Sequence, residues 1–381
     1  MAAHRYCLQN NHYKITVQLK SIQYVRAIAA LMVVFYHETV YLKNMKGDAF
    51  LYDIFGGSPG LYGVIAFFIV TGYLMADIAP KYRPSTFLMH RVLRIYPAYW
   101  FCVLLAGLFY VVLWHASANA DYIPNLQTML LANGFSRDLL RLTLAPMVFN
   151  DYPLGIEWTL LYETSFYVVV FLMSLTGRLK YLPHLAIGWL AVVVITIWVF
   201  PASQAGYTQP SFLTLPFFAI NTAFTLGILG QRLQTKVEPF SAIVLGLLVV
   251  ASAEVFKTSF DIVHICLGVF SIVMGLIALE RRGKLPDIPA LRKLGDWSYV
   301  LYLVHVTVIL GVFKLVNASS GVLLVLATTV AILVSAVLGQ LDLACYRKLK
   351  GLCDRATPRL HQGLAAAFIT VFFTAALFGL K

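Results

Sequence analysis

The most constraining feature of the chain is a series of hydrophobic stretches, each long enough to cross a bilayer as a helix. A spanning helix needs about 17–25 apolar residues, and such stretches recur along most of the 381 residues. Apolar residues make up 60% of the chain and charged residues only 12%, whereas a soluble globular chain carries about 25% charged residues. The sequence therefore predicts an all-α fold, a polytopic transmembrane helix bundle of about ten core helices plus one C-terminal helix. The expected spans are 22–42, 61–79, 95–114, 157–176, 183–201, 212–230, 240–256, 261–280, 296–316, 321–343 and 362–380.

The basic residues are distributed unevenly between the two sides of this expected bundle. With a cytoplasmic N-terminus, 21 of the 29 Lys and Arg residues fall on the cytoplasmic side and seven on the other, and Arg26 lies within the membrane. This bias follows the positive-inside rule and predicts that the N-terminus is cytoplasmic. The net charge of +12 is then explained by topology and by attraction to anionic membrane lipids, so no nucleic-acid partner is expected.

The sequence predicts one membrane domain, residues 21–346, preceded by a cytoplasmic segment, 1–20, and followed by a basic loop and an additional transmembrane helix, 347–381. No cleavable signal peptide is expected, because the first twenty residues are polar and the first apolar run is long enough to be a permanent span. The apolar run 139–149 is too short to cross, so we expect it to be re-entrant or interfacial. The five cysteines have no disulfide or zinc spacing, and no metal is expected.

Arg26 and His37 lie eleven residues apart in the first expected span. This spacing is about three helical turns, which places both side chains on one face, roughly 16 Å apart along the axis. Such groups are costly in hydrocarbon and mark a functional site by default. His37 could act as a general base, or it could be a structural imidazole that donates to a backbone carbonyl. Arg26 could instead extend to the inner interface.

Two further segments carry charge near the membrane. Arg91 and Arg94 share a helical face at the expected inner surface, where they would suit a phosphate-rich ligand or serve as ordinary positive-inside anchors. Glu163 lies about two turns into its span, where a carboxylate needs a partner, either His37 or an arginine.

A polar stripe marks the ninth expected span. Ser298, Tyr302 and His305 recur at i, i+4 and i+7, which is one helix face. Such a stripe can line a substrate path, or it can provide hydrogen bonds between helices.

Taken in order, these segments resemble the acyltransferase-3 family of membrane O-acyltransferases. The resemblance covers roughly residues 20–345, and each motif is loose on its own, whereas five in order are specific. Two departures are that Thr71 stands where members often have Ser, and that residues 340–350 read QLDLACYRKLK where members often have Glu-Arg-Pro-like residues. The matching segments are Arg26 with His37, FFIVTGYL at 67–74, Arg91 to Trp100, Trp158 to Tyr167, and Leu294 to His305.

The resemblance implies a stand-alone enzyme of the bacterial cytoplasmic (inner) membrane, similar to exopolysaccharide-production acetyltransferases. It would transfer an O-acetyl group from acetyl-CoA, or another acyl-CoA, at the cytoplasmic face to a hydroxyl of a cell-surface or lipid-linked carbohydrate. His37 would be the base, and Glu163 would orient it or bind the sugar. Arg26, the third expected catalytic residue, would help Arg91 and Arg94 to hold the phosphates of the donor. The expected substrate-binding residues are Arg91, Arg94, Tyr73, Trp158, Ser298, Tyr302 and His305.

Two other classes of protein fit the same buried charges. A transporter or flippase for a polyprenyl-linked or anionic glycan would use them for binding without chemistry. A structural subunit of a polysaccharide export complex would use them for assembly. Within the enzyme class, direct transfer and a covalent acyl-histidine relay both fit the residues.

Overall fold

The protein is a bundle of helices whose computed structural model describes residues 19–116, 140–147, 153–256 and 258–378. In this part of the chain all regular elements are helical, and nine helices are long and apolar enough to cross a membrane. The expected all-α, polytopic bundle is therefore confirmed, and the chain is a multi-pass membrane protein. Almost all of the expected cytoplasmic segment 1–20 lies outside the described residues.

Twelve α-helices are present among the described residues. They are α1 (Lys20–Tyr41), α2 (Phe50–Phe55), α3 (Ser58–Ile78), α4 (Pro84–Ala116), α7 (Trp158–Leu175), α8 (Leu182–Val199), α9 (Asn221–Leu233), α10 (Pro239–Val255), α11 (Asp261–Arg281), α12 (Pro289–Leu315), α13 (Ser320–Arg355) and α14 (Pro358–Phe378). A π-helical turn at Leu42–Lys46 and 3₁₀ turns at Ala79–Lys81, Leu179–Tyr181, Pro201–Gly206 and Leu215–Phe217 join several of them.

The expected span 212–230 is wrong over its first half. Helix α9 begins only at Asn221 and has 13 residues, about 20 Å, which is short of the roughly 30 Å hydrocarbon core. Pro216 explains the interruption, because proline has no N–H and disfavours helical conformation in the residue before it. The Asn221 side chain donates hydrogen bonds to the carbonyls of Leu215 and Phe218, at 2.7 and 2.9 Å, and so ties the start of α9 to the preceding turn.

Helix α13 is longer than the expected span 321–343. It continues to Arg355, so residues 347–355, expected in a basic loop, are helical. The segment contains no proline before Pro358, and an i,i+4 ion pair between Lys350 and Asp354, 2.8 Å long, supports the extra turns.

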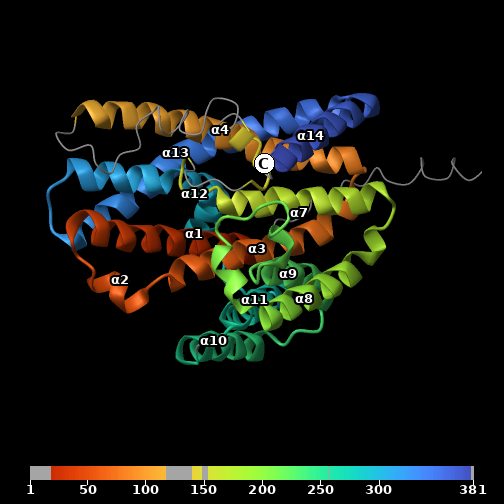
Figure 1. Ribbon diagram of the computed structural model, residues 1–381, viewed down its shortest axis with the longest axis horizontal. Coiled ribbons are helices and arrows are strands. Elements are labelled where there is room, and N and C mark those ends of the chain that lie inside the picture. The colour runs from red at the N-terminus through yellow and green to blue at the C-terminus, as the bar shows by residue number, and fades with distance from the viewer. Residues whose placement is uncertain (1–18, 117–139, 148–152, 257, 379–381) are drawn as a thin grey trace, which may run out of the picture.

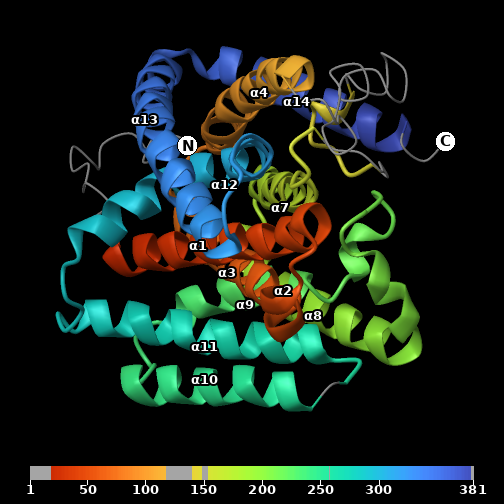
Figure 2. The same cartoon turned by 90° about the vertical axis from the view of Figure 1, so that its left-hand side faces the viewer.

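Helix α1 lies in the middle of the bundle, packed against α3 and α12. Helices α4, α13 and α14 lie on one side of it, and α10 lies at the opposite edge beyond α11 (Figures 1 and 2). Glycine lets α1 and α12 approach closely, because a Cβ on Gly295 would collide with the backbone carbonyl of Gln23. The start of α1 is fixed from α11, where the Glu280 carboxylate accepts hydrogen bonds from the backbone N–H groups of Lys20 and Ser21, each 2.8 Å.

Residues 140–147 form a segment packed between α4 and α7; Leu140 and Arg141 are helical, and 142–147 are turn and irregular backbone. Its backbone carbonyls accept hydrogen bonds from side chains of both helices: Tyr96 to Thr143 at 2.6 Å, Trp100 to Leu142 at 3.0 Å, and Thr164 to Leu144 at 2.7 Å. Irregular backbone at membrane depth requires such partners. The described part of the expected re-entrant or interfacial run 139–149 is thus packed against protein, with residues 144–147 buried, while residues 139, 148 and 149 lie outside the described ranges.

Candidate active site

Two cavities meet beside α1, and each contains one residue of the Arg26–His37 pair. The arginine cavity holds about 780 Å³ of empty space and is lined from α1, α3, α4, α7 and α12. The histidine cavity holds about 980 Å³ and is lined from α1, α3, α7, α12 and the loop at 207–209. Val64 and Tyr302 line both cavities, so the two spaces are neighbours.

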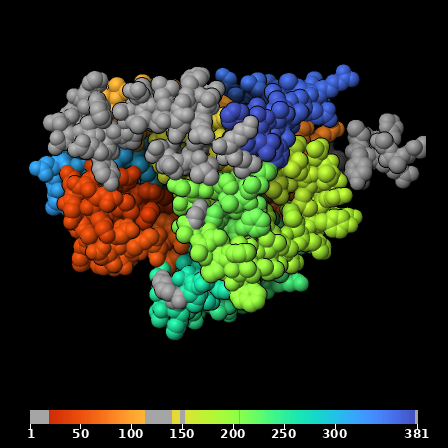
Figure 3. All heavy atoms as spheres, in the orientation of Figure 1, coloured from red at the N-terminus to blue at the C-terminus, as the bar shows by residue number. Residues whose placement is uncertain are grey.

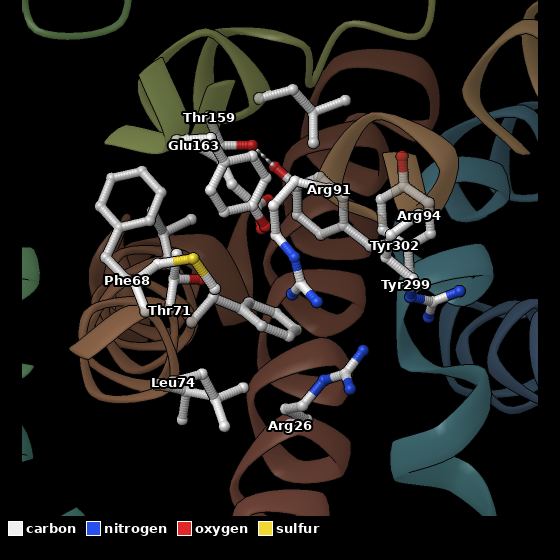
Figure 4. Close-up of a pocket in the computed structure, with 16 residues that line it drawn as sticks. Arg26, Phe68, Thr71, Leu74, Arg91, Arg94, Thr159, Glu163, Tyr299 and Tyr302 are labelled. Carbon is white, nitrogen blue, oxygen red and sulfur yellow. Dashed lines mark hydrogen bonds between the residues drawn. The ribbon is translucent and has the colours of Figure 1, made fainter. Parts of the chain in front are cut away.

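The arginine cavity collects three guanidinium groups, from Arg26 on α1 and from Arg91 and Arg94 on α4. In the close-up view the guanidinium groups of Arg26 and Arg91 point into the same region (Figure 4). Arg94 forms a 2.6 Å ion pair with Asp342 of α13, and both side chains are largely buried. Among the described residues, neither Arg26 nor Arg91 has a hydrogen-bonded or ion-paired partner. The cavity therefore offers two cationic forks to an anionic ligand.

The wall of the arginine cavity that comes from α3 is mainly apolar. Phe67, Phe68, Thr71 and Leu74 line it, so the motif at 67–74 turns most of one helix face toward the site. Tyr73 of the same motif points elsewhere, since its hydroxyl contacts Gln234 and lies 3.5 Å from Nη2 of Arg281. The predicted role of Tyr73 in substrate binding thus has no support from its position.

Glu163 lines the arginine cavity and accepts a hydrogen bond from Tyr167 one turn further along α7 (Figure 4). Trp158, at the start of α7, lines the histidine cavity instead. Helix α7 therefore passes the two cavities in the opposite direction from α1, which brings Glu163 to the level of Arg26. The sequence left His37 or an arginine as the partner of Glu163. In this structure Glu163 does not orient His37 and instead faces the arginines.

The histidine cavity is built around His37. Its Nδ1 lies 2.9 Å from the carbonyl oxygen of Val33 and 3.2 Å from Nε2 of His305 on α12. Trp158 and Tyr207 line the cavity and pack edge to face, with ring centroids 5.5 Å apart. Burial raises the pKa of the Tyr207 hydroxyl, so this group stays protonated and can donate a hydrogen bond.

Two separate parts of the chain complete the lining of the histidine cavity. Gly57 and Gly60 lie at the start of α3, and residues 207–209 belong to the loop before α9. The space-filling view shows these two regions, orange-red and green, next to each other on one face (Figure 3). The cavity thus lies toward the end of α1 where His37 is found, away from the N-terminal end that carries Arg26.

Tyr302 forms the wall between the cavities. Its hydroxyl lies 2.7 Å from Oγ1 of Thr159 and donates to the carbonyl of Ile156 at 3.2 Å. These bonds tie α12 to the start of α7. A group that passes from one cavity to the other must therefore pass beside Tyr302 and Val64.

The predicted stripe Ser298, Tyr302 and His305 is divided by the structure. Only Tyr302 lines a cavity. Ser298 is fully buried and donates to the carbonyl of Gly295 at 2.8 Å. His305 is also fully buried and contacts His37. Neither Ser298 nor His305 is placed to touch a ligand in either cavity, because the helix face that they share with Tyr302 also packs against α1.

Several site residues were not predicted from the sequence. Asp342 pairs with Arg94 and could have been noticed as the lone carboxylate of the basic segment 340–350. Tyr299 lines the arginine cavity and donates to the carbonyl of Ile95 at 2.9 Å. The loop residue Tyr207 carries no signal in the sequence, because its position depends on how the loop at 207–209 folds over the bundle.

A comparison with protein-family models identifies the family of the chain. The model of the acyltransferase-3 family, described as an acyltransferase domain, matches residues 19–340, a range that includes the predicted site residues from Arg26 to His305. The chain therefore belongs to this family and is a multi-pass membrane acyltransferase. It is similar to the exopolysaccharide production protein ExoZ of Rhizobium meliloti (strain 1021), with 26% identity over 262 residues that cover 65% of this chain and 75% of ExoZ. No solved structure matches the chain.

Proposed function

We propose that the protein transfers an acetyl group from acetyl-CoA, bound in the arginine cavity, to a hydroxyl of a cell-surface or lipid-linked carbohydrate in the histidine cavity. The observation that carries this proposal is the division of α1 between the two spaces. Arg26 faces one cavity and His37 faces the other, and the cavities share Val64 and Tyr302. A donor anchored on one side can then meet an acceptor on the other.

The donor site is proposed for the arginine cavity because coenzyme A carries several phosphates. Guanidinium groups bind phosphate oxygens through two parallel charge-assisted hydrogen bonds. Arg26 and Arg91 supply the two forks without an ion-pair partner among the described residues. The apolar walls from Phe67, Phe68 and Leu74 suit the long arm that carries the thioester toward Tyr302.

The acceptor site is proposed for the histidine cavity because it combines aromatic rings with hydrogen-bonding groups. Trp158 and Tyr207 offer ring faces and edges to a sugar, and Gln209 adds a polar side chain. Similarity to ExoZ, a protein named for exopolysaccharide production, favours a polysaccharide or its lipid-linked precursor. Similarity to a bacterial protein favours the bacterial inner membrane, and the positive-inside bias favours a cytoplasmic N-terminus, with the donor bound from the cytoplasm.

His37 is proposed as the general base. Its Nδ1 faces the carbonyl of Val33, which can only accept, so the hydrogen-bond partners assign the proton to Nδ1 and the lone pair to Nε2. The acceptor hydroxyl gives its proton to Nε2 while its oxygen attacks the thioester carbon. The carbon–sulfur bond breaks, and the leaving thiolate of coenzyme A takes the proton from Nε2. A base in this position contributes about 10²–10⁴ in rate.

The proposal is tested with purified protein in lipid nanodiscs, acetyl-CoA and a glycan acceptor. Free coenzyme A and acetylated glycan are expected to form together in the wild-type protein. His37→Ala, at equal folded concentration, is expected to form neither above background. A transporter or flippase would release no coenzyme A. Absence of release in the wild-type protein with a panel of bacterial glycans, or full activity of His37→Ala, would contradict the proposal.

A further inference from the structure

His37 is in contact with a second histidine that lines neither cavity. Nε2 of His305 lies 3.2 Å from Nδ1 of His37, and the two rings meet edge to face with centroids 4.9 Å apart. His305 is fully buried, whereas His37 lines the histidine cavity. The two residues are 268 positions apart, so the contact joins α1 to α12.

The neighbours of the two rings determine where the protons lie. Nδ1 of His305 is 2.7 Å from the carbonyl oxygen of Tyr302 and 3.2 Å from that of Leu301. Carbonyl oxygens only accept, so Nδ1 of His305 carries a proton, and its Nε2 in the neutral ring is an acceptor. His37 therefore has two acceptors at Nδ1, the carbonyl of Val33 and Nε2 of His305. Both assign the proton of His37 to Nδ1.

We infer that His305 is a positioning residue that holds His37 as a base, with Nε2 bare toward the histidine cavity, by accepting a hydrogen bond from Nδ1. The inference rests on the proposed function. The bond to Val33 comes from the same helix, four residues earlier, whereas His305 reaches the ring from a different helix. With both bonds, the position of the ring is fixed relative to α12, the helix that also supplies the wall residue Tyr302.

The same bond stabilises His37 after it takes the acceptor proton. The imidazolium then donates its Nδ1–H to Nε2 of His305, and a hydrogen bond with a charged donor is about twice as strong as a neutral one. In serine hydrolases a carboxylate plays this part. Here Glu163, the carboxylate expected to do so, lies in the other cavity, and a neutral imidazole tied to the backbone of α12 takes its place. The proton stays on His37, so His305 needs to accept a hydrogen bond and does not need to ionise.

The test separates a residue that only accepts a hydrogen bond from one that must take up a proton. His305→Leu removes the acceptor, and a charge-assisted bond of its kind corresponds to a decrease of about 10-fold to 100-fold in kcat. His305→Gln keeps an acceptor oxygen at similar reach but cannot take a proton, so kcat is expected within about threefold of wild type. The KM for acetyl-CoA is expected to be unchanged in both variants. Thr307→Val is the matched control, because it removes a different interhelical contact of α12, 3.3 Å from Thr307 to the Tyr110 hydroxyl, and should leave kcat unchanged.

Wild-type kcat in His305→Leu, or equal losses in His305→Leu and His305→Gln, would overturn the inference. If His305→Leu does not fold, His305→Gln decides alone, since a loss of tenfold or more contradicts a positioning role. An independent measurement uses ¹⁵N-histidine NMR of the full chain in nanodiscs, with His37 assigned by His37→Gln. A scalar coupling between Nδ1 of His37 and Nε2 of His305 is expected in the wild-type protein, and its absence there would overturn the inference. Because this readout needs no turnover, failure of the proposed function and failure of the inference remain distinguishable.

Discussion

The two cavities beside α1 differ in how they hold polar groups inside an apolar bundle. The arginine cavity contains full charges, and only Arg94 has its charge matched by an ion pair among the described residues, with Asp342 at 2.6 Å. The histidine cavity contains groups that are neutral at their ordinary protonation, and its key ring is bonded to a backbone carbonyl and to His305. Unmatched charge suits the recognition of an anion, while a neutral ring held through Nδ1, with a free lone pair on Nε2, suits a base.

The supports of the two cavities also come from different helices. Helix α4, which carries Arg91 and Arg94, is bound to α13 through Asp342 and through a 2.7 Å bond from His90 to Asp354. Asp342 and Asp354 both lie beyond the range that the family model matches. The base is held by α12 within that range. This difference between the two cavities predicts that changes in the arginine cavity affect donor binding. Changes in the histidine cavity should affect turnover.

Replacement of the base should have the largest effect. His37→Gln keeps a polar side chain of similar size but cannot take the acceptor proton, so kcat should decrease by about 10²–10⁴, with the KM for acetyl-CoA unchanged. Release of coenzyme A in the presence of acceptor measures both values. His184→Gln, an exposed histidine on α8, is the control. A change in KM as large as the change in kcat would remove the separation between the two cavities.

Replacement of an unpaired arginine should act on the donor. Arg91→Gln removes one fork for phosphate, and charge-assisted hydrogen bonds contribute about 1.5–3 kcal/mol, so the KM for acetyl-CoA should increase about 10-fold to 100-fold. Arg91→Lys should raise the KM for acetyl-CoA less than Arg91→Gln does, because lysine keeps the charge without the bidentate geometry. Arg83→Gln, an exposed change just before α4, should behave as wild type. Unchanged donor KM in Arg91→Gln would show that the phosphates bind elsewhere.

Replacement of the carboxylate behind Arg94 should act on stability. Asp342→Asn leaves the guanidinium without its ion-pair partner in a largely buried position, and loss of one partner of this kind costs about 1–3 kcal/mol. A lower melting temperature in a thermal unfolding assay is the expected result. Asp354→Asn, on the same helix but more exposed, should cost less. Equal stability of the Asp342→Asn variant and wild type would show that α13 does not support α4 in this way.

The wall between the cavities should show the smallest effect. Tyr302→Phe removes the bonds of the hydroxyl to Thr159 and Ile156, which contribute about 1 kcal/mol, while the ring still separates the two spaces. Thermal stability should decrease slightly and kcat should change by less than about fivefold. The double variant with Thr159→Val should be little worse than either single one, because both remove the same bond. A loss of kcat as large as that of His37→Gln would assign Tyr302 to the chemistry.

Much of this arrangement follows from local sequence, and the remainder depends on packing. The helical period correctly placed Arg26 and His37 on the inward face of α1, because that spacing depends on one helix only. The partner of His37 is 268 residues away and that of Arg94 is 248 residues away. Such pairs depend on how helices cross, which a single sequence does not specify.

The predictions that the structure corrects also depended on the packing of neighbouring segments. Hydropathy alone predicted that the span begins at 212, although Pro216 indicates a break in the helix. Glu163 could face His37 or an arginine until the direction in which α7 passes α1 was known. The stripe of Ser298, Tyr302 and His305 was visible as a helix face, but which member meets a cavity depends on the neighbouring helix.

The central claim is that one helix serves a donor site and a separate base. The most direct test is equilibrium binding of coenzyme A to wild type, His37→Gln and Arg91→Gln in nanodiscs, by calorimetric titration. We expect His37→Gln to bind with the wild-type Kd within about twofold, and Arg91→Gln to bind at least about tenfold more weakly. Equal Kd values for all three proteins, or loss of binding in His37→Gln, would contradict the account.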